Sequence, residues 1–98
     1  MDILDEIVAH KRIEIAAMKE QLSERDIHRL VEPILCQSVT SLSNALRNSD
    51  SGIIAEFKRK SPSKGWIHED GKADVIPFSY QQHGASALSI LTDEMYFG

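Results

Sequence analysis

Two short apolar segments with a predicted helix between them limit what this chain can fold into. Residues 53–58 and 87–92 have the composition of strands, and turn-forming residues precede the first of them. Between them, Asp74 can cap a helix, Pro77 is tolerated in its first turn, and Gly84 can end it. A strand, a helix and a strand in this order predict a βαβ unit with parallel strands and a right-handed crossover.

A βαβ unit with two strands is too small to be a complete sheet. Parallel sheets occur almost only as larger sheets that are covered on both faces. The sequence has 98 residues and stops soon after the second predicted strand, where the pattern calls for another helix. We therefore expect the chain to be the amino-terminal part of a longer α/β protein.

Helices are predicted over most of the sequence before the first strand. Over residues 2–22, apolar residues recur at intervals of three, four and seven, which marks one face of a helix. Asp2 can cap this helix. A second helix is expected after Ser23, which has Asp26 three residues later in a weak capping-box pattern. A third short helix is expected over residues 41–47.

The cluster of turn-forming residues at 48–52 is the clearest boundary in the chain. All six aromatic residues follow residue 56, and aromatic side chains supply much of the apolar area of a core. The part before the boundary is therefore not expected to form a core alone. We divide the chain into a helical amino-terminal extension, residues 1–50, and the βαβ unit, residues 51–98.

Composition narrows the class of protein. A formal net charge of −4 and 42% hydrophobic residues are ordinary for a globular protein and argue against disorder. No apolar run reaches the roughly 20 residues that a membrane-spanning helix needs, and the acidic amino terminus is unlike a signal peptide. The single cysteine, Cys36, can form no internal disulfide, which fits a reducing compartment. We expect a cytoplasmic protein that does not bind membranes.

Glu56 and Lys58 are the residues that best indicate chemistry. They lie two apart in the first predicted strand and therefore share a face, which a parallel sheet would normally bury. Burying both charges costs several kcal/mol each unless they are paired or needed for function. A site at the carboxyl end of the strand explains them, with Lys58 as a proton donor or anion ligand and Glu56 as a proton acceptor. A solvated face of an edge strand is the alternative.

The loop that follows contains four basic residues and no acidic one over residues 58–65. Main-chain N–H groups, the hydroxyls of Ser61 and Ser63, and these cations can together bind a carboxylate or phosphate. A nucleic-acid patch is a second interpretation, which the net acidity and the lack of another basic stripe disfavour. A solvated loop is the third. The loop is not a phosphate-binding Walker motif, because Gly65 is its one glycine and no Gly-Lys-Ser/Thr follows.

The sequence predicts no metal site, since the four histidines are scattered and no pair has metal-ligand spacing. Asp93 and Glu94 follow the second strand at its carboxyl end, which in a parallel sheet is the same rim as Lys58. Tyr96 and Phe97 would line an apolar pocket at that rim, or cover the rest of a core.

The pattern over residues 53–63 is specific. Two apolar residues, any residue, Glu, an apolar residue and Lys precede a short basic stretch and Ser-Pro-Ser. In this it resembles the signature of the indole-3-glycerol phosphate synthase family. The similarity continues through residues 73–84 and 88–97, which look like the family's first helix, second strand and following loop. The first predicted helix is similar to the helical extension before the family's barrel, so that the resemblance covers the whole chain.

The resemblance implies an α/β fold, the amino-terminal part of a (βα)8 TIM barrel with a helical amino-terminal extension, truncated after the second strand. The family closes the ring of 1-(2-carboxyphenylamino)-1-deoxyribulose 5-phosphate with loss of CO2 and water, without a metal or organic cofactor. By position, Lys58 would be the proton donor and electrostatic anchor, and Glu56 its partner and a proton acceptor. Ser61 would help to hold the anthranilate carboxylate, and Phe97 would form a wall against the anthranilate ring.

The family's other catalytic and phosphate-binding residues belong to later strands. We therefore expect the full-length parent to be a carboxy-lyase of tryptophan biosynthesis and this chain alone to be inactive. One alternative is a non-catalytic βαβ module that associates with itself through unpaired strand edges. Another is a small nucleic-acid binder. Within the enzyme class the runner-up is phosphoribosylanthranilate isomerase, which is not expected to carry Glu-x-Lys before Ser-Pro-Ser.

Overall fold

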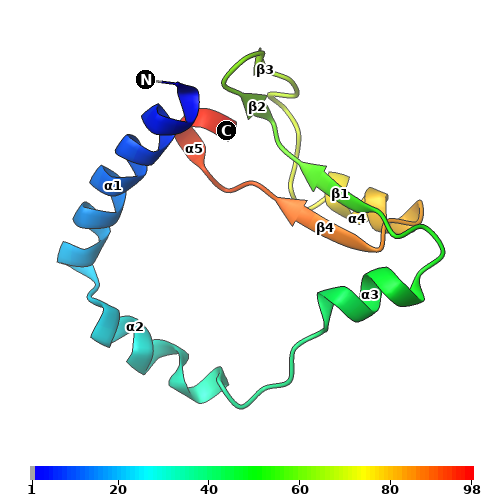
Figure 1. Cartoon of the computed structure of the whole chain (residues 1–98), viewed down its shortest axis with the longest axis horizontal. Coiled ribbons are helices and arrows are strands. Elements are labelled where there is room, and N and C mark those ends of the chain that lie inside the picture. The colour runs from blue at the N-terminus through cyan, green and yellow to red at the C-terminus, as the bar shows by residue number, and fades with distance from the viewer. Residues whose placement is uncertain (1) are drawn as a thin grey trace. The chain divides into compact units, whose positions relative to one another are not determined.

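The structure is a computed structural model that describes residues 2–98 (Figure 1). The chain divides into two compact units, of which one ends at Val39 and the other runs from Thr40 to Gly98. The second unit therefore includes the helix that precedes the boundary predicted at residues 48–52.

The first unit holds two helices, α1 (Ile3–Gln21) and α2 (Glu24–Val31), followed by a 3-10 turn, η1 (Glu32–Ile34). Both helices begin at the predicted caps, Asp2 and Ser23, and each cap is part of a complete capping box. In such a box the capping side chain accepts a main-chain N–H three residues on, and the side chain there returns a bond to the N–H of the cap. None of the described side chains in α1, α2 or η1 is buried.

The charged face of α1 carries local ion pairs. Nε2 of His10 lies 2.6 Å from one carboxylate oxygen of Glu14, and Nζ of Lys11 lies 2.9 Å from the other. The hydrogen bond from Lys11 is the main reason why the pKa of Glu14 is lower than its ordinary value. These contacts join side chains of α1 itself.

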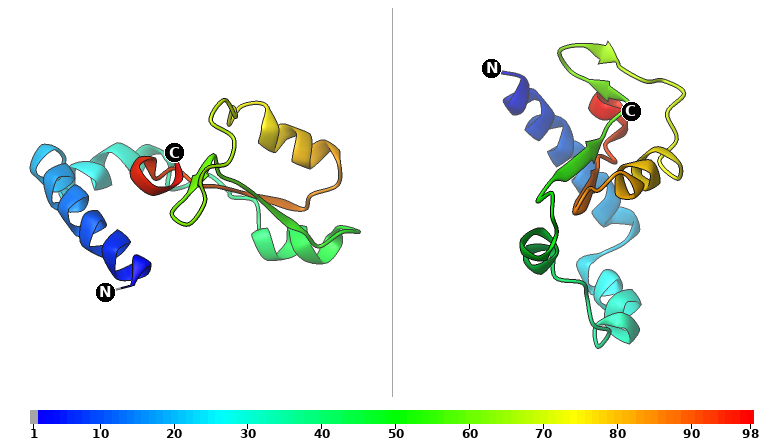
Figure 2. Two further views of the ribbon diagram at one scale, coloured as in Figure 1. Left: turned by 90° about the horizontal axis from the view of Figure 1, so that it is seen from above. Right: turned by 90° about the vertical axis from the view of Figure 1, so that its right-hand side faces the viewer.

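The second unit is built around a pair of parallel strands. In chain order its elements are α3 (Leu42–Asn48), β1 (Ile54–Phe57), β2 (Lys60–Ser61), β3 (Gly65–Trp66), α4 (Ile76–Gln82), β4 (Ala87–Ile90) and α5 (Glu94–Phe97). The predicted βαβ unit is confirmed, because β1 and β4 pair in parallel and α4 lies between them in the chain. Figure 2 shows α4 and α3 on opposite sides of this two-stranded sheet.

The core of the second unit is small. Phe57 on β1 is 5% exposed and Tyr96 on α5 is 7% exposed, and they are the buried apolar side chains of the described core. Pro77, in the first turn of α4, is buried as well. Successive strand residues point to opposite faces, so the burial of Phe57 leaves Glu56 on the other face.

The start of α4 differs from the prediction. Val75 is the residue before the helix, and no side chain caps it. The carbonyl of Lys72 accepts hydrogen bonds from the N–H groups of Val75 and Ile76, so the chain is already turned when it enters the helix. Asp74 lies inside this turn, one residue before the N-cap position, which Val75 occupies.

Two elements of the second unit are absent from the sequence-based expectation. The segment after the first strand was expected to be a loop, but β2 and β3 pair there as a short antiparallel hairpin. No element was predicted after the second strand, but residues 93–98 contain the single-turn helix α5. Both elements follow the carboxyl ends of the parallel strands, where the candidate site residues lie.

We predict that Phe57→Ala lowers the free energy of unfolding of the second unit by about 3–5 kcal/mol, because it removes the most buried aromatic ring. Phe78→Ala is the matched control, since it removes the same atoms from a side chain of α4 that is 57% exposed. It should change stability by about 0.5 kcal/mol or less. Urea denaturation of the 98-residue chain, followed by circular dichroism, measures both, and equal losses would contradict this account of the core.

Candidate functional site

The candidate site residues lie at the carboxyl ends of β1 and β4. The N–H of Leu91 donates to the carbonyl of Phe57 at 3.1 Å, so the parallel pairing continues to the end of both strands. Lys58 follows β1 directly, and Asp93 follows β4 after two further residues. The segments that follow the two strands therefore begin at the same end of the sheet, as the sequence predicts.

Glu56 is held by a residue of the neighbouring strand. Ser89 is its register partner on β4, and the Ser89 hydroxyl donates to Oε2 of Glu56 at 3.1 Å. Glu56 and Lys58 are both exposed, and within residues 2–98 no hydrogen bond or ion pair joins them. The sequence predicted that the face of Glu56 and Lys58 is buried, and this is not found in the 98-residue chain. α4 packs on the other face, that of Phe57, and the carboxyl end of the strand on the face of Glu56 is exposed to solvent.

The β2–β3 hairpin fixes Ser61. The register pairs Ser61 with Gly65, and the Ser61 side chain, 6% exposed, accepts a hydrogen bond from the N–H of Lys64 at 3.1 Å. Gly65 has a φ of +67°, a conformation that glycine adopts readily. The Ser-Pro-Ser-Lys-Gly segment is thus a tight turn, which its Pro62 and Gly65 signal in the sequence.

The loop after β4 is shaped by a cap. The carboxylate of Asp93 accepts a hydrogen bond from the N–H of Tyr96 at 2.7 Å and so begins α5. Within this helix Tyr96 is buried, while Phe97 is half-buried. An Asp before Glu94 is the one sequence signal for this element, and a single turn is too short for periodicity to reveal.

Two of the four cations in the basic loop bind main-chain oxygens. Nε and Nη2 of Arg59 donate to the oxygen of Gly98 at 2.9 and 2.6 Å, and Nη1 donates to the carbonyl of Glu69 at 3.2 Å. Nζ of Lys60 donates to the carbonyl of Met95 at 3.1 Å. These two side chains are therefore structural, and they tie the loop after β1 to the loop after β4. The side chains of the other two, Lys58 and Lys64, make no hydrogen bond or ion pair within the described residues.

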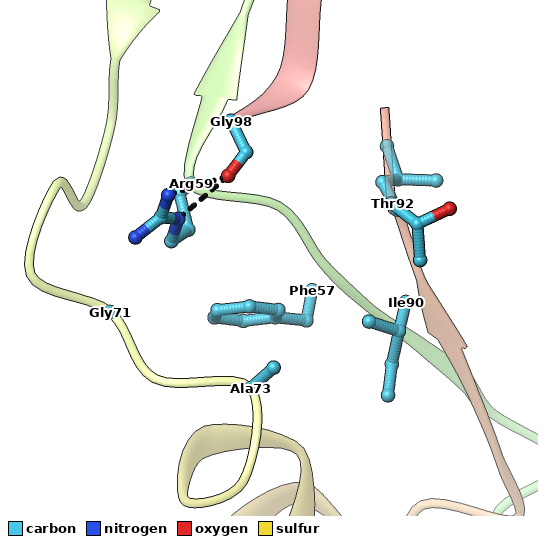
Figure 3. A pocket seen from close by; sticks show the side chains of 8 residues that line it. Phe57, Arg59, Gly71, Ala73, Ile90, Thr92 and Gly98 are labelled. Carbon is cyan, nitrogen blue, oxygen red and sulfur yellow. Dashed lines mark hydrogen bonds between the residues drawn. The ribbon is translucent and has the colours of Figure 1, made fainter. Parts of the chain in front are cut away.

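A pocket of about 240 Å³ lies beside Phe57 (Figure 3). Its lining comes from the end of both strands, the segment before α4 and the two loops: Phe57, Arg59, Gly71, Ala73, Ile90, Leu91, Thr92 and Gly98. Figure 3 shows Phe57 and Ile90, register partners on β1 and β4, side by side in this lining. Because Phe57 points away from the face of Glu56, this pocket is separate from the predicted acid–base pair.

Other kinds of site have little support in the described chain. Within residues 2–98, no group of three or more His, Cys, Asp or Glu side chains is placed to hold a metal ion. Cys36 is exposed and not in a disulfide. A search of the same residues finds no helix that combines the length and the apolar character needed to cross a membrane.

Comparison with known proteins identifies relatives over almost the whole chain. Residues 4–98 match the model of the family described as indole-3-glycerol phosphate synthase. A protein of that name from Bacteroides thetaiotaomicron is 50% identical over 97 residues, which are 99% of this chain and 36% of the relative. Relatives of the same name from Dechloromonas aromatica and Prochlorococcus marinus are 41% and 40% identical, with 98% of this chain matched and 37% and 32% of the relative.

The chain thus spans about a third of the length of these curated relatives. The matched part includes both strands of the parallel pair, the hairpin and α5. With the family model matched from residue 4 to residue 98, this chain belongs to the indole-3-glycerol phosphate synthase family.

Proposed function

We propose that this chain supplies the first part of the active site of an indole-3-glycerol phosphate synthase, a carboxy-lyase of tryptophan biosynthesis. The observation that supports the proposal is that Glu56 lies in a parallel strand and Lys58 directly follows the carboxyl end of that strand, in a chain of this family. Enzymes built on (βα)8 barrels have their active sites at that end of the strands.

We infer that β1 and β4 are the first two strands of such a barrel and that α4 is its first outer helix. In this arrangement residues 51–98 form the first barrel unit and residues 1–50 the helical extension. The face of Phe57 points outward to α4, and the face of Glu56 points into the barrel. The exposure of that face in the described chain supports this, because the remaining strands would enclose it.

The proposed substrate is 1-(2-carboxyphenylamino)-1-deoxyribulose 5-phosphate, and the site is expected in the cytoplasm. Lys58 is the proposed proton donor to the sugar carbonyl oxygen, which must leave as water after the new ring bond forms. Its charge also attracts the anionic substrate. Glu56 is the proposed proton acceptor. A cavity that excludes water favours loss of CO2 from the anthranilate carboxylate.

Two further residues have proposed binding roles. Ser61 would donate its hydroxyl hydrogen to the anthranilate carboxylate, since its oxygen already accepts the N–H of Lys64. Phe97 would lie against the anthranilate ring, as an aromatic side chain does in an offset or edge contact. Ring closure, loss of CO2 and loss of water need acid–base catalysis but no external oxidant or reductant, so we propose no metal or organic cofactor.

A chimaera tests the proposal, because the chain aligns with 36% of the Bacteroides thetaiotaomicron relative. Residues 1–98 replace the matching segment, and turnover of the carboxyphenylamino-deoxyribulose phosphate is measured. We expect activity, and we expect Glu56→Gln and Lys58→Met each to lower kcat by about 10²–10⁴-fold, the usual effect of losing a general acid or base.

Glu69→Gln and Lys72→Met make the same changes of charge and size and are the controls. Both residues are exposed and lie farther along the segment between β1 and α4. They should leave kcat within about twofold, as surface changes usually do. A folded but inactive chimaera, or full activity in Glu56→Gln, would overturn the proposed function. The 98-residue chain alone should show no turnover near the rate of the chimaera.

The hydrogen bond between Ser89 and Glu56 gives a second prediction. In the chimaera, Ser89→Thr keeps a hydroxyl that can reach Oε2 of Glu56, whereas Ser89→Val has the same shape without it. We expect kcat for the Val variant to be about tenfold lower than for the Thr variant, the size of one hydrogen bond to a charged group. KM should differ little between them. Equal kcat values would show that the hydroxyl does not orient Glu56.

Self-association of the isolated chain is the second candidate function. In the described residues β1 and β4 each pair along one edge only, and unpaired edges bind other strands. Ile54 on the face of Glu56 is 51% exposed, and Leu88 and Ile90 on the face of Phe57 are 40% and 43% exposed, so each face leaves apolar surface for a second copy.

We expect sedimentation velocity of the 98-residue chain to show a concentration-dependent dimer. Ile54→Lys should weaken it by about tenfold or more, because a charge would then lie at the sheet edge. Val39→Lys is the control, since Val39 is 91% exposed and outside the sheet. A monomer at every concentration would rule out this association.

A further inference from the structure

Trp66 is the one tryptophan of the sequence, and it has two cations beside its ring. It lies on β3 directly opposite Lys60 on β2. Nζ of Lys60 is 5.3 Å from the centroid of the indole, and Cζ of Arg59 is 5.6 Å from it. Both distances are within the range of cation–π attraction, for which tryptophan is the strongest partner.

The same two cations bind the backbone of the α5 segment. Lys60 donates to the carbonyl of Met95, and Arg59 donates twice to the oxygen of Gly98. Each cation is therefore held between an aromatic face on the hairpin and a main-chain oxygen on the other loop. Trp66 is 49% exposed, so the two cations and the partial burial of its surface together hold the ring in place.

The end of α5 also approaches the indole directly. A Cβ atom placed on Gly98 would lie 2.9 Å from Cζ3 of Trp66, which is closer than such atoms approach in proteins. Gly98 has a φ of +73°, a conformation that glycine adopts at little cost. The backbone of the second loop therefore packs against the ring of Trp66 at a position where a side chain has no room.

We propose that Trp66 is a positioning residue that holds the β2–β3 hairpin against α5 and so sets Ser61 and Phe97 relative to each other. Ser61 is the residue after Lys60, and Phe97 is the residue before Gly98. Lys60 and Gly98 both lie against the indole. A shift of the ring would therefore move the proposed substrate-binding side chains next to them. The catalytic use of this arrangement rests on the proposed function, whereas the contact between the hairpin and α5 does not.

Amide hydrogen exchange of the 98-residue chain tests the structural part. The N–H of Gly98 donates to the carbonyl of Glu94 at 3.0 Å, so its exchange rate reports whether the α5 turn is formed. We expect Trp66→Ala to raise this rate by about tenfold and Trp66→Phe to raise it less. Ile67→Ala is the control, since Ile67 is the next residue and is 53% exposed. Equal rates in Trp66→Ala and Ile67→Ala would overturn the proposal.

Steady-state kinetics of the chimaera test the functional part. We expect Trp66→Ala to raise KM by about fivefold to tenfold and to leave kcat within about twofold, because Glu56 and Lys58 are positioned by β1 rather than by the hairpin. Trp66→Phe should restore most of the affinity, since it keeps an aromatic face for the cations.

Each outcome separates the two proposals. If Trp66→Ala reduces the amount of folded chimaera but leaves KM unchanged, Trp66 is merely structural. An unchanged KM in a fully folded Trp66→Ala chimaera would also overturn a role in positioning. If the unsubstituted chimaera has no synthase activity, the proposed function fails and the positioning of a substrate fails with it. The exchange experiment then still decides whether Trp66 holds α5 in place.

Discussion

The main-chain hydrogen bonds between β1 and β4 determine where the candidate residues lie. They run from the N–H of Ser86, which donates to Ile53, to the N–H of Leu91, which donates to Phe57. This register brings Ser89 beside Glu56, and it places the carboxyl ends of both strands at the same end of the sheet. Because the pairing is parallel, the two following loops start as neighbours, and their further contacts depend on that start.

The two ends of this strand pair are used differently. At the amino end, serine hydroxyls satisfy polar groups of the turns: Ser51 donates to the carbonyl of Gly84 at 2.5 Å, and Ser49 and Ser86 are hydrogen-bonded to each other. At the carboxyl end, Lys58 remains without such a bond within the described residues. The carboxyl end therefore holds both side chains that stabilise the fold, such as Arg59 and Lys60, and a cation that the fold does not use.

Local patterns predicted the parts that depend on neighbours in sequence. Asp2 and Ser23 cap their helices, and the apolar segments around α4 form the parallel strands. The hairpin and α5 were missed because each is too short for hydrophobic periodicity to reveal, although Pro62, Gly65 and Asp93 are local signals for them. The exposure of Glu56 could not be predicted from a pattern either, because it depends on which elements cover the sheet, not on the strand itself.

The contact between Trp66 and Gly98 also bears on how sequences of this kind can change. The indole occupies the space that a side chain at position 98 would need. A larger residue at 98 is therefore compatible with the same loop path only if position 66 becomes smaller, and the backbone at 98 must also leave its positive φ. The two positions share one volume, so they are expected to vary as a pair during divergence rather than one at a time.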